Sequence, residues 1–519
     1  MKNKRHFFNT TGPCNPEDHY MLSPEERLVG GQLSRYIEDK LYWVLHAPRQ
    51  TGKTTFLQSW MREINAGDKQ VACYVTVERC QGVADPKDAI PAICNAIKAS
   101  ADIYELPIPE TIDDPLSALS HTLKDWAKLV APKPLVVLFD EVDVLVGETL
   151  ISFLRQLRGG FASRGVGKFP VSLALVGMRD LKDYITTAKD GVAPNPGSPF
   201  NIKKDSAQLT NFSENDITRL FAQRTEETGQ PITAEALKYV FEQSYGQPWI
   251  VNSLFDRATT RILDRDSTET VTIEHIKEAR EQMVMARETH LDTLAYRLED
   301  ERIRRVIEKL MTGEADARLA EGEPFRICND LGLIARTDNG WTVANPIYRE
   351  VIAREITFSS QEMIPKPEWR WQNDDGSLDM DALLREFQKF WRRHSEVWES
   401  RSNYTEAFPH LLLMAFLQRV INGGGHIDRE YAAGRGRMDL ALLYNRRWYI
   451  IEIKLIHDYD TPETVREEGL EQITRYRNSI DPATPSYLAI FDRRKKSKDL
   501  PWDEKIKWET EGDIAILWQ

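Results

Sequence analysis

The stretch LYWVLHAPRQTGKTTFL, residues 41–57, decides how the first part of the chain folds. Its apolar start, residues 41–45, predicts a buried strand, and the residues from Lys53 onward predict a helix. A loop with the pattern AxxxxGKT between a strand and a helix is typical of a phosphate-binding loop. Backbone N–H groups of such a loop, together with the positive end of the helix, bind the phosphates of a nucleoside triphosphate.

Two side chains in this loop have predicted roles. Lys53 neutralises phosphate oxygens, and the hydroxyl of Thr54 holds Mg²⁺. Ala47 stands where the usual pattern has its first glycine, and alanine is small enough for that turn, so we expect a weakened fit at most. The strand before and the helix after disfavour a chance GKT in a surface loop. We expect the nucleotide to contact Ala47, Pro48, Arg49, Gln50, Thr51, Gly52, Lys53, Thr54 and Thr55.

A second apolar stretch, PLVVLFDEVDVL at residues 134–145, ends its predicted strand in two carboxylates. Asp140 at the tip of a parallel strand lies beside the phosphate loop, where it can hold the water shell of Mg²⁺. Glu141 is placed to orient and polarise the attacking water. The alternative is that the two acids only cap the next helix. A later strand ends near Arg179, which is a candidate sensor of the γ-phosphate.

Helical patterns follow from about residue 213, and Gly246-Gln247-Pro248 introduces one of these helices. The order of two Walker motifs, a strand ending in arginine, and a helical bundle containing GxP resembles the STAND branch of AAA+-like ATPases over about the first 290 residues. This resemblance implies a nucleotide-gated switch that forms homo-oligomers, with Pro248 facing the nucleotide. Before the first strand, Tyr20 and Met21 either wall an adenine pocket or pack in the core under the first helix.

Residues 333–343 form two short apolar pieces around Asp338-Asn339-Gly340 and predict a β-hairpin. The segment resembles the winged-helix module that follows the lid in STAND ATPases. Such a module either binds DNA or packs against the ATPase as a relay.

The C-terminal part carries a second set of charged residues in two apolar strands, MDLALLY and WYIIEIKL. Glu452 and Lys454 lie on the same face because side chains alternate along a strand, and Asp439 can meet them from the neighbouring strand. Two carboxylates then bind a divalent metal that acidifies a water, and the lysine steadies the nucleophile or the phosphate. The alternative is a salt-bridged Asp–Lys pair on a half-exposed sheet.

These residues resemble the D…ExK motif of the PD-(D/E)xK nuclease superfamily. The resemblance implies that Glu406, on a preceding helix, is a further metal ligand, with His410 as the alternative for that place. It also implies a supporting QxxxY motif, formed here by Gln472 and Tyr476. Basic residues near the motif would bind phosphates without reading sequence; they are Arg435, Arg437, Arg446, Arg447, Arg493, Arg494, Lys495, Lys496 and Lys498.

Composition limits the other possibilities. The net charge of -12 argues against a globally basic nucleic-acid surface, so any DNA contact is local. Five scattered cysteines without a CxxC pair argue against a disulfide framework or a zinc site. No run reaches the ~18 apolar residues of a membrane span, and the N-terminus lacks an apolar signal segment, so we expect a cytoplasmic protein without membrane contact.

The sequence thus predicts a multidomain α/β protein. The expected parts are a P-loop ATPase with a parallel sheet (1–205), a helical lid (206–290), a winged helix (291–358), a linker and connecting helix (359–400), and a restriction-endonuclease-like α/β domain (401–519). The expected cofactors are ATP and Mg²⁺, with Mn²⁺ as an alternative at the nuclease site. The expected substrate is DNA, with RNA as the alternative. Two rivals are a regulatory NTPase whose nuclease-like domain only binds nucleic acid or a partner, and a DNA motor that translocates and cuts.

Overall fold

The fold comes from a computed structural model of the chain. It describes residues 6–29, 33–178, 203–286, 296–311, 320, 322–337, 340–352, 371, 373, 375–399, 412–413, 416–417, 425–433, 436–494, 497 and 500–519. Of these, residues 24, 203–206, 285–286, 393–399, 425–433, 436–439 and 479–480 are described by their backbone only. The chain divides into two compact units, Met1–Leu294 with Ala317–Arg349, and Ala295–Asp316 with Glu350–Gln519.

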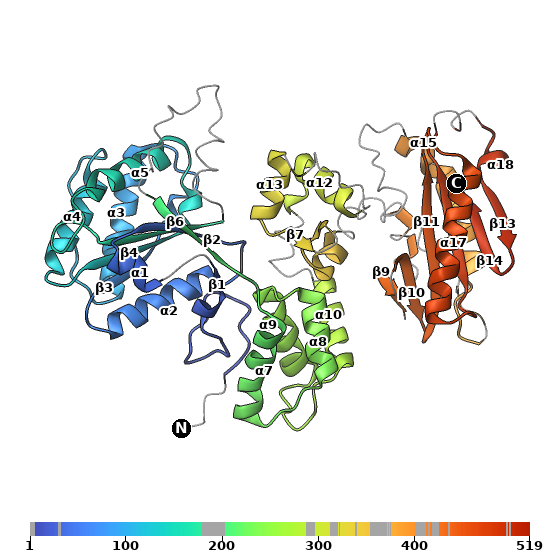
Figure 1. The fold of residues 1–519 in the computed structure, drawn as a ribbon, viewed down its shortest axis with the longest axis horizontal. Helices are drawn as coiled ribbons and strands as arrows, with labels where there is room; N and C mark the ends of the chain where they lie inside the picture. Colours follow the sequence, from blue (N-terminus) through green and yellow to red (C-terminus); the bar gives the residue numbers. More distant parts are fainter. Residues whose placement is uncertain are drawn as a thin grey trace. The chain divides into compact units, whose positions relative to one another are not determined.

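The first unit is built on a six-stranded sheet with the order β1-β6-β2-β5-β4-β3 (Figure 1). The central strands are parallel, as expected for strands that are connected through helices. Only β1 pairs antiparallel, with β6. The strands are β1 (Leu28–Val29), β2 (Tyr42–His46), β3 (Val71–Thr76), β4 (Leu135–Asp140), β5 (Ser172–Gly177) and β6 (Lys203–Leu209). The predicted strands before the phosphate loop and before Asp140 are β2 and β4.

Helices cover both faces of this sheet. One apolar core joins the sheet to α3, α4 and α5, and a second core joins its other face to α1 and α2. Continuous burial along β4 and β5 follows from this two-sided cover. The helices are α1 (Leu33–Glu38), α2 (Lys53–Ala66), α3 (Pro86–Ile103), α4 (Ala118–Leu129) and α5 (Gly147–Phe161), with single turns at Pro24–Arg27, Glu78–Cys80 and Val142–Val144.

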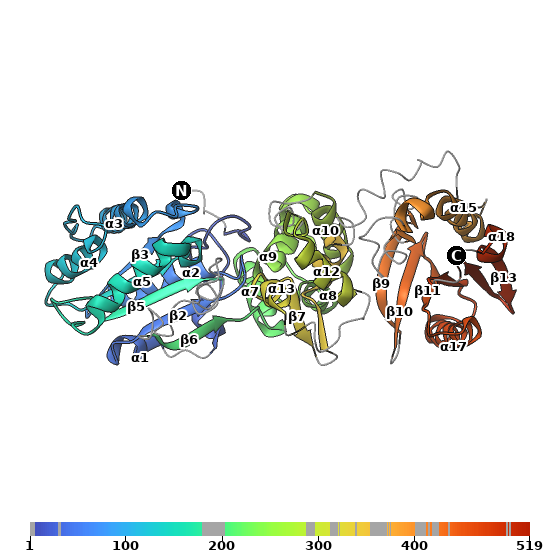
Figure 2. The same cartoon turned by 90° about the horizontal axis from the view of Figure 1, so that it is seen from above.

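A bundle of short helices follows the sheet, as predicted (Figure 2). The side chain of Ser213 accepts the N–H of Asp216 in a capping box that starts the first of them. The bundle consists of α7 (Glu214–Thr228), α8 (Ala234–Ser244), α9 (Pro248–Asp256), a π-helical turn (Arg257–Ile262) and α10 (Ile273–Ala286).

The predicted hairpin is present next in the chain. Strands β7 (Ile334–Thr337) and β8 (Gly340–Val343) pair antiparallel, directly after helix α13 (Glu323–Asp330). The rings of Trp341 and Phe325 pack edge to face, with their centres 4.9 Å apart, and this contact fixes the hairpin to α13.

The second unit contains a mixed sheet with the order β13-β14-β12-β11-β10-β9. Helices α15 and α17 pack on its opposite faces. Its elements are α12 (Glu301–Met311), α15 (Met380–Glu399), β9 (Gly425–Ala433), β10 (Gly436–Tyr444), β11 (Arg447–Ile456), α17 (Pro462–Ile480), β12 (Ser486–Asp492), α18 (Trp502–Lys505), β13 (Lys507–Glu511) and β14 (Ile514–Trp518). The core of this unit therefore includes α15, which the sequence placed in a connecting segment.

Two further predictions concern the whole chain. All five cysteines are free, and four of them are buried, which fits the absence of a disulfide framework. None of the helices in the described ranges has the length and hydrophobicity that a membrane crossing requires.

Candidate active sites

The phosphate-binding loop leaves β2 at Ala47 and enters α2 at Lys53. Gln50 and Gly52 adopt left-handed φ angles of 57° and 93°, so the loop doubles back over the start of the helix. The ammonium group of Lys53 donates to the carbonyl oxygens of Ala47 and Pro48 at 2.8 and 2.9 Å. Burial lowers the pKa of Lys53, while the Asp140 and Asp143 carboxylates oppose that shift. The lysine thus closes the loop at the place predicted for phosphates.

Asp140 ends β4 beside this loop. Its Oδ2 accepts the hydroxyl of Thr54 at 2.6 Å and that of Tyr74 at 3.1 Å, and its Oδ1 accepts the N–H of Glu141 at 2.9 Å. Burial raises the pKa of Asp140, and the Thr54 hydrogen bond and the Lys53 charge oppose this. A hydroxyl and a carboxylate oxygen this close are donors that fit Mg²⁺. No sequence motif predicts a role for Tyr74, whose hydroxyl contacts Asp140 from the neighbouring strand β3.

Glu141, directly after β4, has a left-handed φ of 58°, a strained backbone conformation for a residue with a side chain. Burial first, and then the neighbouring carboxylates of Glu78, Asp140 and Asp143, raise the pKa of Glu141 to about 7. A carboxylate with this pKa accepts a proton readily near neutral pH, which is the property required of a general base.

A buried arginine that the sequence did not single out fixes the loop. Arg27 is 6% exposed; its guanidinium donates to the carbonyl oxygens of Thr51 at 3.0 Å and Thr210 at 2.8 Å. It also lies 4.8 Å from the centre of the Phe212 ring. Burial lowers the pKa of Arg27 to about 10, so the group stays charged at neutral pH. Arg27 therefore joins the phosphate loop to the segment that leads into the helical bundle.

The predicted GxP element reaches the same place. Pro248 begins α9, and Gln247 caps this helix while its Nε2 lies 3.4 Å from the carbonyl oxygen of Gln50. Gly246 has a φ of 72°, and a Cβ there would lie 1.8 Å from the backbone oxygen of Phe212. Only glycine fits this position, so the bundle is held against Phe212 and, through it, against Arg27.

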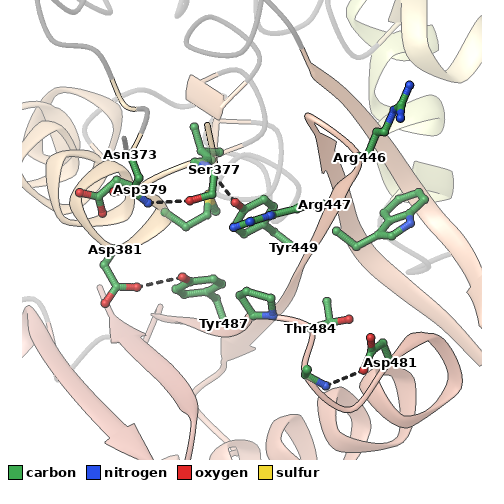
Figure 3. Close-up of a pocket in the computed structure, with 15 residues that line it drawn as sticks. Asn373, Ser377, Asp379, Asp381, Arg446, Arg447, Tyr449, Asp481, Thr484 and Tyr487 are labelled. Carbon is green, nitrogen blue, oxygen red and sulfur yellow. Dashed lines mark hydrogen bonds between the residues drawn. The ribbon is translucent and has the colours of Figure 1, made fainter. Parts of the chain in front are cut away.

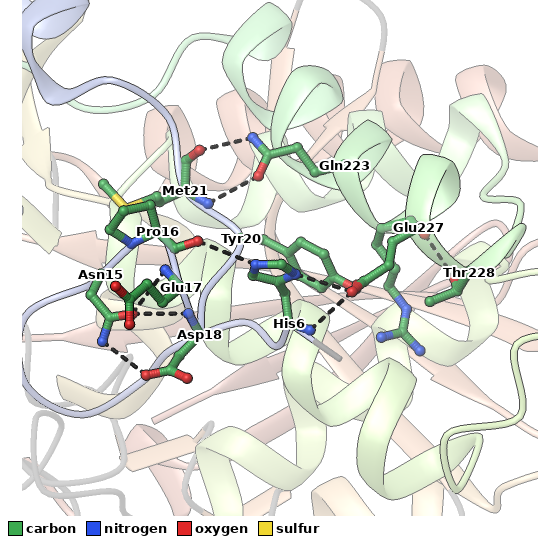
Figure 4. A network of polar contacts seen from close by, with 11 residues as sticks. His6, Asn15, Pro16, Glu17, Asp18, Tyr20, Met21, Gln223, Glu227 and Thr228 are labelled. Atoms are coloured by element: carbon green, nitrogen blue, oxygen red, sulfur yellow. Dashed lines mark hydrogen bonds and ion pairs between the residues drawn. The ribbon is translucent and has the colours of Figure 1, made fainter. Parts of the chain in front are cut away.

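The N-terminal segment is tied to α7 by the contacts drawn in Figure 4. Tyr20 donates its hydroxyl to Glu227, and His6 lies 3.0 Å from the same carboxylate. The backbone of Met21 exchanges two hydrogen bonds with the Gln223 side chain. Tyr20 is buried against the Phe8 ring and bonds to α7, so it packs on the helical bundle; a role of Tyr20 and Met21 at an adenine pocket stays a prediction. Arg179 lies outside the described residues.

The second candidate site lies on β11. Glu452 is 2% exposed, and its Oε1 accepts a hydrogen bond from the Lys454 ammonium group at 2.9 Å, so both side chains share one face of the strand. Strands β10 and β11 are antiparallel, with Leu440 opposite Ile451. One residue further in this register, Asp439 stands opposite Glu452. Among the described residues no three His, Cys, Asp or Glu side chains are grouped as metal ligands; the Asp439 side chain, Glu406 and His410 lie outside that description.

Helix α17 carries the predicted QxxxY pair against this sheet. Gln472 and Tyr476 are one turn apart, and Tyr476 is buried in the core that α17 shares with β11. Gly469 comes close to the strand as well: a Cβ there would lie 3.3 Å from Cγ of Lys454. The helix therefore packs directly over the lysine.

The basic hairpin turn lies far from these residues. Asn445 and Arg446 form the turn with left-handed φ angles of 46° and 64°. At ~3.3 Å per residue, Arg447 is about 23 Å along β11 from Lys454. The turn instead borders a cavity of about 670 Å³ (Figure 3). There Arg447 pairs with Asp375 at 2.9 Å and the Tyr449 hydroxyl accepts the N–H of Leu378 at 2.8 Å.

Comparison with family models decides the class of both parts. The model of an AAA domain matches residues 37–185, and that of the PD-(D/E)XK nuclease superfamily matches residues 404–490. The chain joins a P-loop AAA ATPase domain to a PD-(D/E)XK superfamily domain. The predicted fold class is confirmed for both domains.

Solved structures similar to this AAA–PD-(D/E)XK chain include a Walker-type ATPase of Pyrococcus abyssi, with 14% identity over 66% of this chain and 99% of that one, at a TM-score of 0.46. The Holliday junction branch migration motor RuvB of Thermotoga maritima has 16% identity over 62% of this chain and 95% of its own, with a TM-score of 0.33. Cdc6p from Pyrobaculum aerophilum has 13% identity over 63% of this chain and 92% of its own, with a TM-score of 0.35. These similarities are too low to bear on function. No curated protein matches the chain.

The role of Glu141 predicts a pH-dependent ATPase. Because a general base must be ionised, hydrolysis should fall below pH about 7 and approach a tenfold loss per pH unit. Glu141→Gln should abolish most hydrolysis while nucleotide still binds. Phosphate release measured from pH 5.5 to 8.5, with nucleotide titrations of both proteins, checks this. A variant that hydrolyses ATP as fast as the wild type would remove Glu141 from the mechanism.

The position of Arg27 predicts its effect on nucleotide binding. Arg27→Ala leaves the buried carbonyl oxygen of Thr51 without this donor, at a cost of ~1–3 kcal/mol, and removes the bond to the exposed residue Thr210. We therefore expect a lower melting temperature and a nucleotide affinity reduced about tenfold or more. Arg35→Ala is the matched control, since Arg35 is exposed on α1 and pairs with the nearby Asp39 at 2.8 Å. Calorimetric titration and thermal unfolding give both quantities. Equal affinities for Arg27→Ala and wild type would contradict the assignment.

Proposed function

We propose that this protein is an ATP-controlled switch that regulates metal-dependent cleavage of DNA by its C-terminal domain. The observation that carries the nuclease part is the Glu452–Lys454 pair on one face of β11, with strand position 439 next in register opposite Glu452. A lysine and an acid this close inside an apolar sheet are costly to bury unless they act together. The match to the nuclease superfamily covers the same strands.

Each residue of this site has a separate proposed role in phosphodiester hydrolysis. A divalent metal held by Asp439 and Glu452, with Glu406 as a further ligand, supplies an acidified water when bound. Mg²⁺ is the proposed ion, with Mn²⁺ as the alternative. The Lys454 side chain is 21% exposed, so its ammonium group can leave Glu452 and neutralise the phosphate or orient the water. Gln472 and Tyr476 support the site from α17.

The ATPase part supports a switch through contacts around its phosphate loop. Lys53 donates to loop carbonyl oxygens, and bound phosphates would compete for the same ammonium group. Gly332, between α13 and β7, also reaches the loop: a Cβ on Gly332 would lie 2.6 Å from Cβ of Pro48. A nucleotide that moves the loop therefore pushes on the α13–hairpin module. This coupling is the behaviour proposed for a STAND-like protein with a winged helix at residues 291–358.

Further parts of the proposal follow from the same resemblance. Thr54 and Asp140 hold Mg²⁺ beside ATP, Arg179 senses the γ-phosphate, and copies of the chain assemble into a homo-oligomer. DNA is the proposed substrate, with RNA as the alternative. A role in defence, repair or control of mobile elements fits this combination of domains.

Cleavage by the purified chain tests the nuclease proposal. In the presence of Mg²⁺ and ATP, wild-type protein should cut DNA, and Lys454→Ala should be slower by about 100-fold or more because it loses a charge at the reacting phosphate. Lys505→Ala, a lysine on the short helix α18, is the matched control and should cut normally. The assay follows labelled single- and double-stranded oligonucleotides on a denaturing gel. Unchanged cleavage by Lys454→Ala would place the activity elsewhere.

The same assay separates the rival functions. Binding of DNA without any cleavage, with ATP hydrolysis intact, would favour a regulatory NTPase whose C-terminal domain only binds. ATP consumption that increases with the length of the DNA would favour a translocating motor over a switch.

A further inference from the structure

The loop after β11 presents an aromatic ring to solvent in a fixed position. Tyr459 is 83% exposed, the highest value among the large hydrophobic side chains of the described residues. The loop is nevertheless ordered: the N–H of His457 donates to the Asp460 carboxylate at 2.9 Å, and the N–H of Asp460 donates to the His457 carbonyl at 3.0 Å. Exposure of Tyr459 is therefore built into the turn.

A second ring holds the tyrosine in orientation. The Tyr459 and His457 rings lie stacked, with centroids 5.3 Å apart and planes 13° from parallel. Because Tyr459 is 83% exposed, this stack is an offset one, and most of the tyrosine ring is left for a planar partner. A ring fixed in this way loses little conformational freedom when it stacks on a ligand.

The loop stands at the end of the sheet that holds the proposed nuclease residues. Lys454 is only two residues before the end of β11 at Ile456. Strand β12 runs parallel to β11 and ends at the same edge, where the N–H of Arg493 donates to the Ile456 carbonyl at 3.0 Å. At ~3.3 Å per residue, Tyr459 begins within about 17 Å of Lys454 along the chain, a span of a few nucleotides.

The chemistry of the loop points to a base and not to a phosphate. Tyr459 is flanked by Asp458 and Asp460, whose charges disfavour a phosphate beside the ring. A nucleobase is planar and uncharged and stacks on tyrosine regardless of its identity. In a blunt duplex the internal bases are stacked on both faces and only the outer faces of the two end pairs are free, so an unpaired base is the preferred partner.

We propose that Tyr459 stacks on an unpaired base of the strand that enters the nuclease site, so that the protein favours single-stranded DNA or DNA with an unpaired end. This inference rests on the proposed nuclease function and specifies its substrate. His457 is a positioning residue that holds the tyrosine ring.

Binding of full-length protein to a labelled 20-nucleotide single strand and to the blunt 20-base-pair duplex tests this inference, by anisotropy without divalent metal. Tyr459→Ala should weaken single-strand binding about 5- to 150-fold, which is the range for loss of one base–aromatic stack. Tyr459→Phe should bind like wild type, and duplex binding should change less than twofold. Because no charge is removed, the dependence of affinity on salt should keep its slope. Tyr296→Ala, which removes another exposed tyrosine of the same unit, is the matched control.

The outcomes distinguish failure of the stacking role from failure of the proposed nuclease function. Equal losses on both DNAs, no loss in Tyr459→Ala, or a Phe variant as weak as the Ala variant would overturn the stacking role while wild-type cleavage keeps the nuclease proposal. If wild-type protein neither binds nor cuts either DNA, both fail together. Thermal unfolding of Tyr459→Ala should match wild type, because the ring is exposed.

Discussion

The hydrogen bond from Thr54 to Asp140 is the contact on which the ATPase site depends. It joins the first turn of α2 to the end of β4, two elements 86 residues apart in sequence. It forms because β2, β5 and β4 run parallel and end at the same edge of the sheet. Once that edge exists, the loop can fold back over Lys53, and Glu141 follows directly after the carboxylate that accepts the Thr54 hydroxyl.

The parts of this site that sequence predicts are those encoded locally. A buried strand, a loop with Gly52 and Lys53 and a helix are neighbours in the chain, as are β4 and its two acids, so their pattern is visible without a structure. Glu452 and Lys454 are equally visible because alternation along one strand fixes their common face. The alternation predicts their common face, and the structure adds the hydrogen bond between them.

The parts that could not be predicted depend on distant partners. Arg27 looks like one more charged residue in PEER, yet its acceptors are Thr51 and Thr210, which are 24 and 183 residues away. The amphipathic pattern of α15 predicts a helix but not the sheet on which it packs. Gly332 and Tyr459 carry no motif at all. Their significance comes from a close approach to Pro48 in one case and from exposure in an ordered turn in the other.

We propose that nucleotide bound at the phosphate loop controls DNA cleavage at β11. The most direct measurement is the initial rate of DNA cleavage with ATP, with ADP and without nucleotide, for wild-type protein and Lys53→Ala. We expect the wild-type cleavage rate to differ between ATP and no nucleotide, and Lys53→Ala to have the same cleavage rate under all three conditions. A wild-type rate that is the same with and without ATP would contradict this proposal.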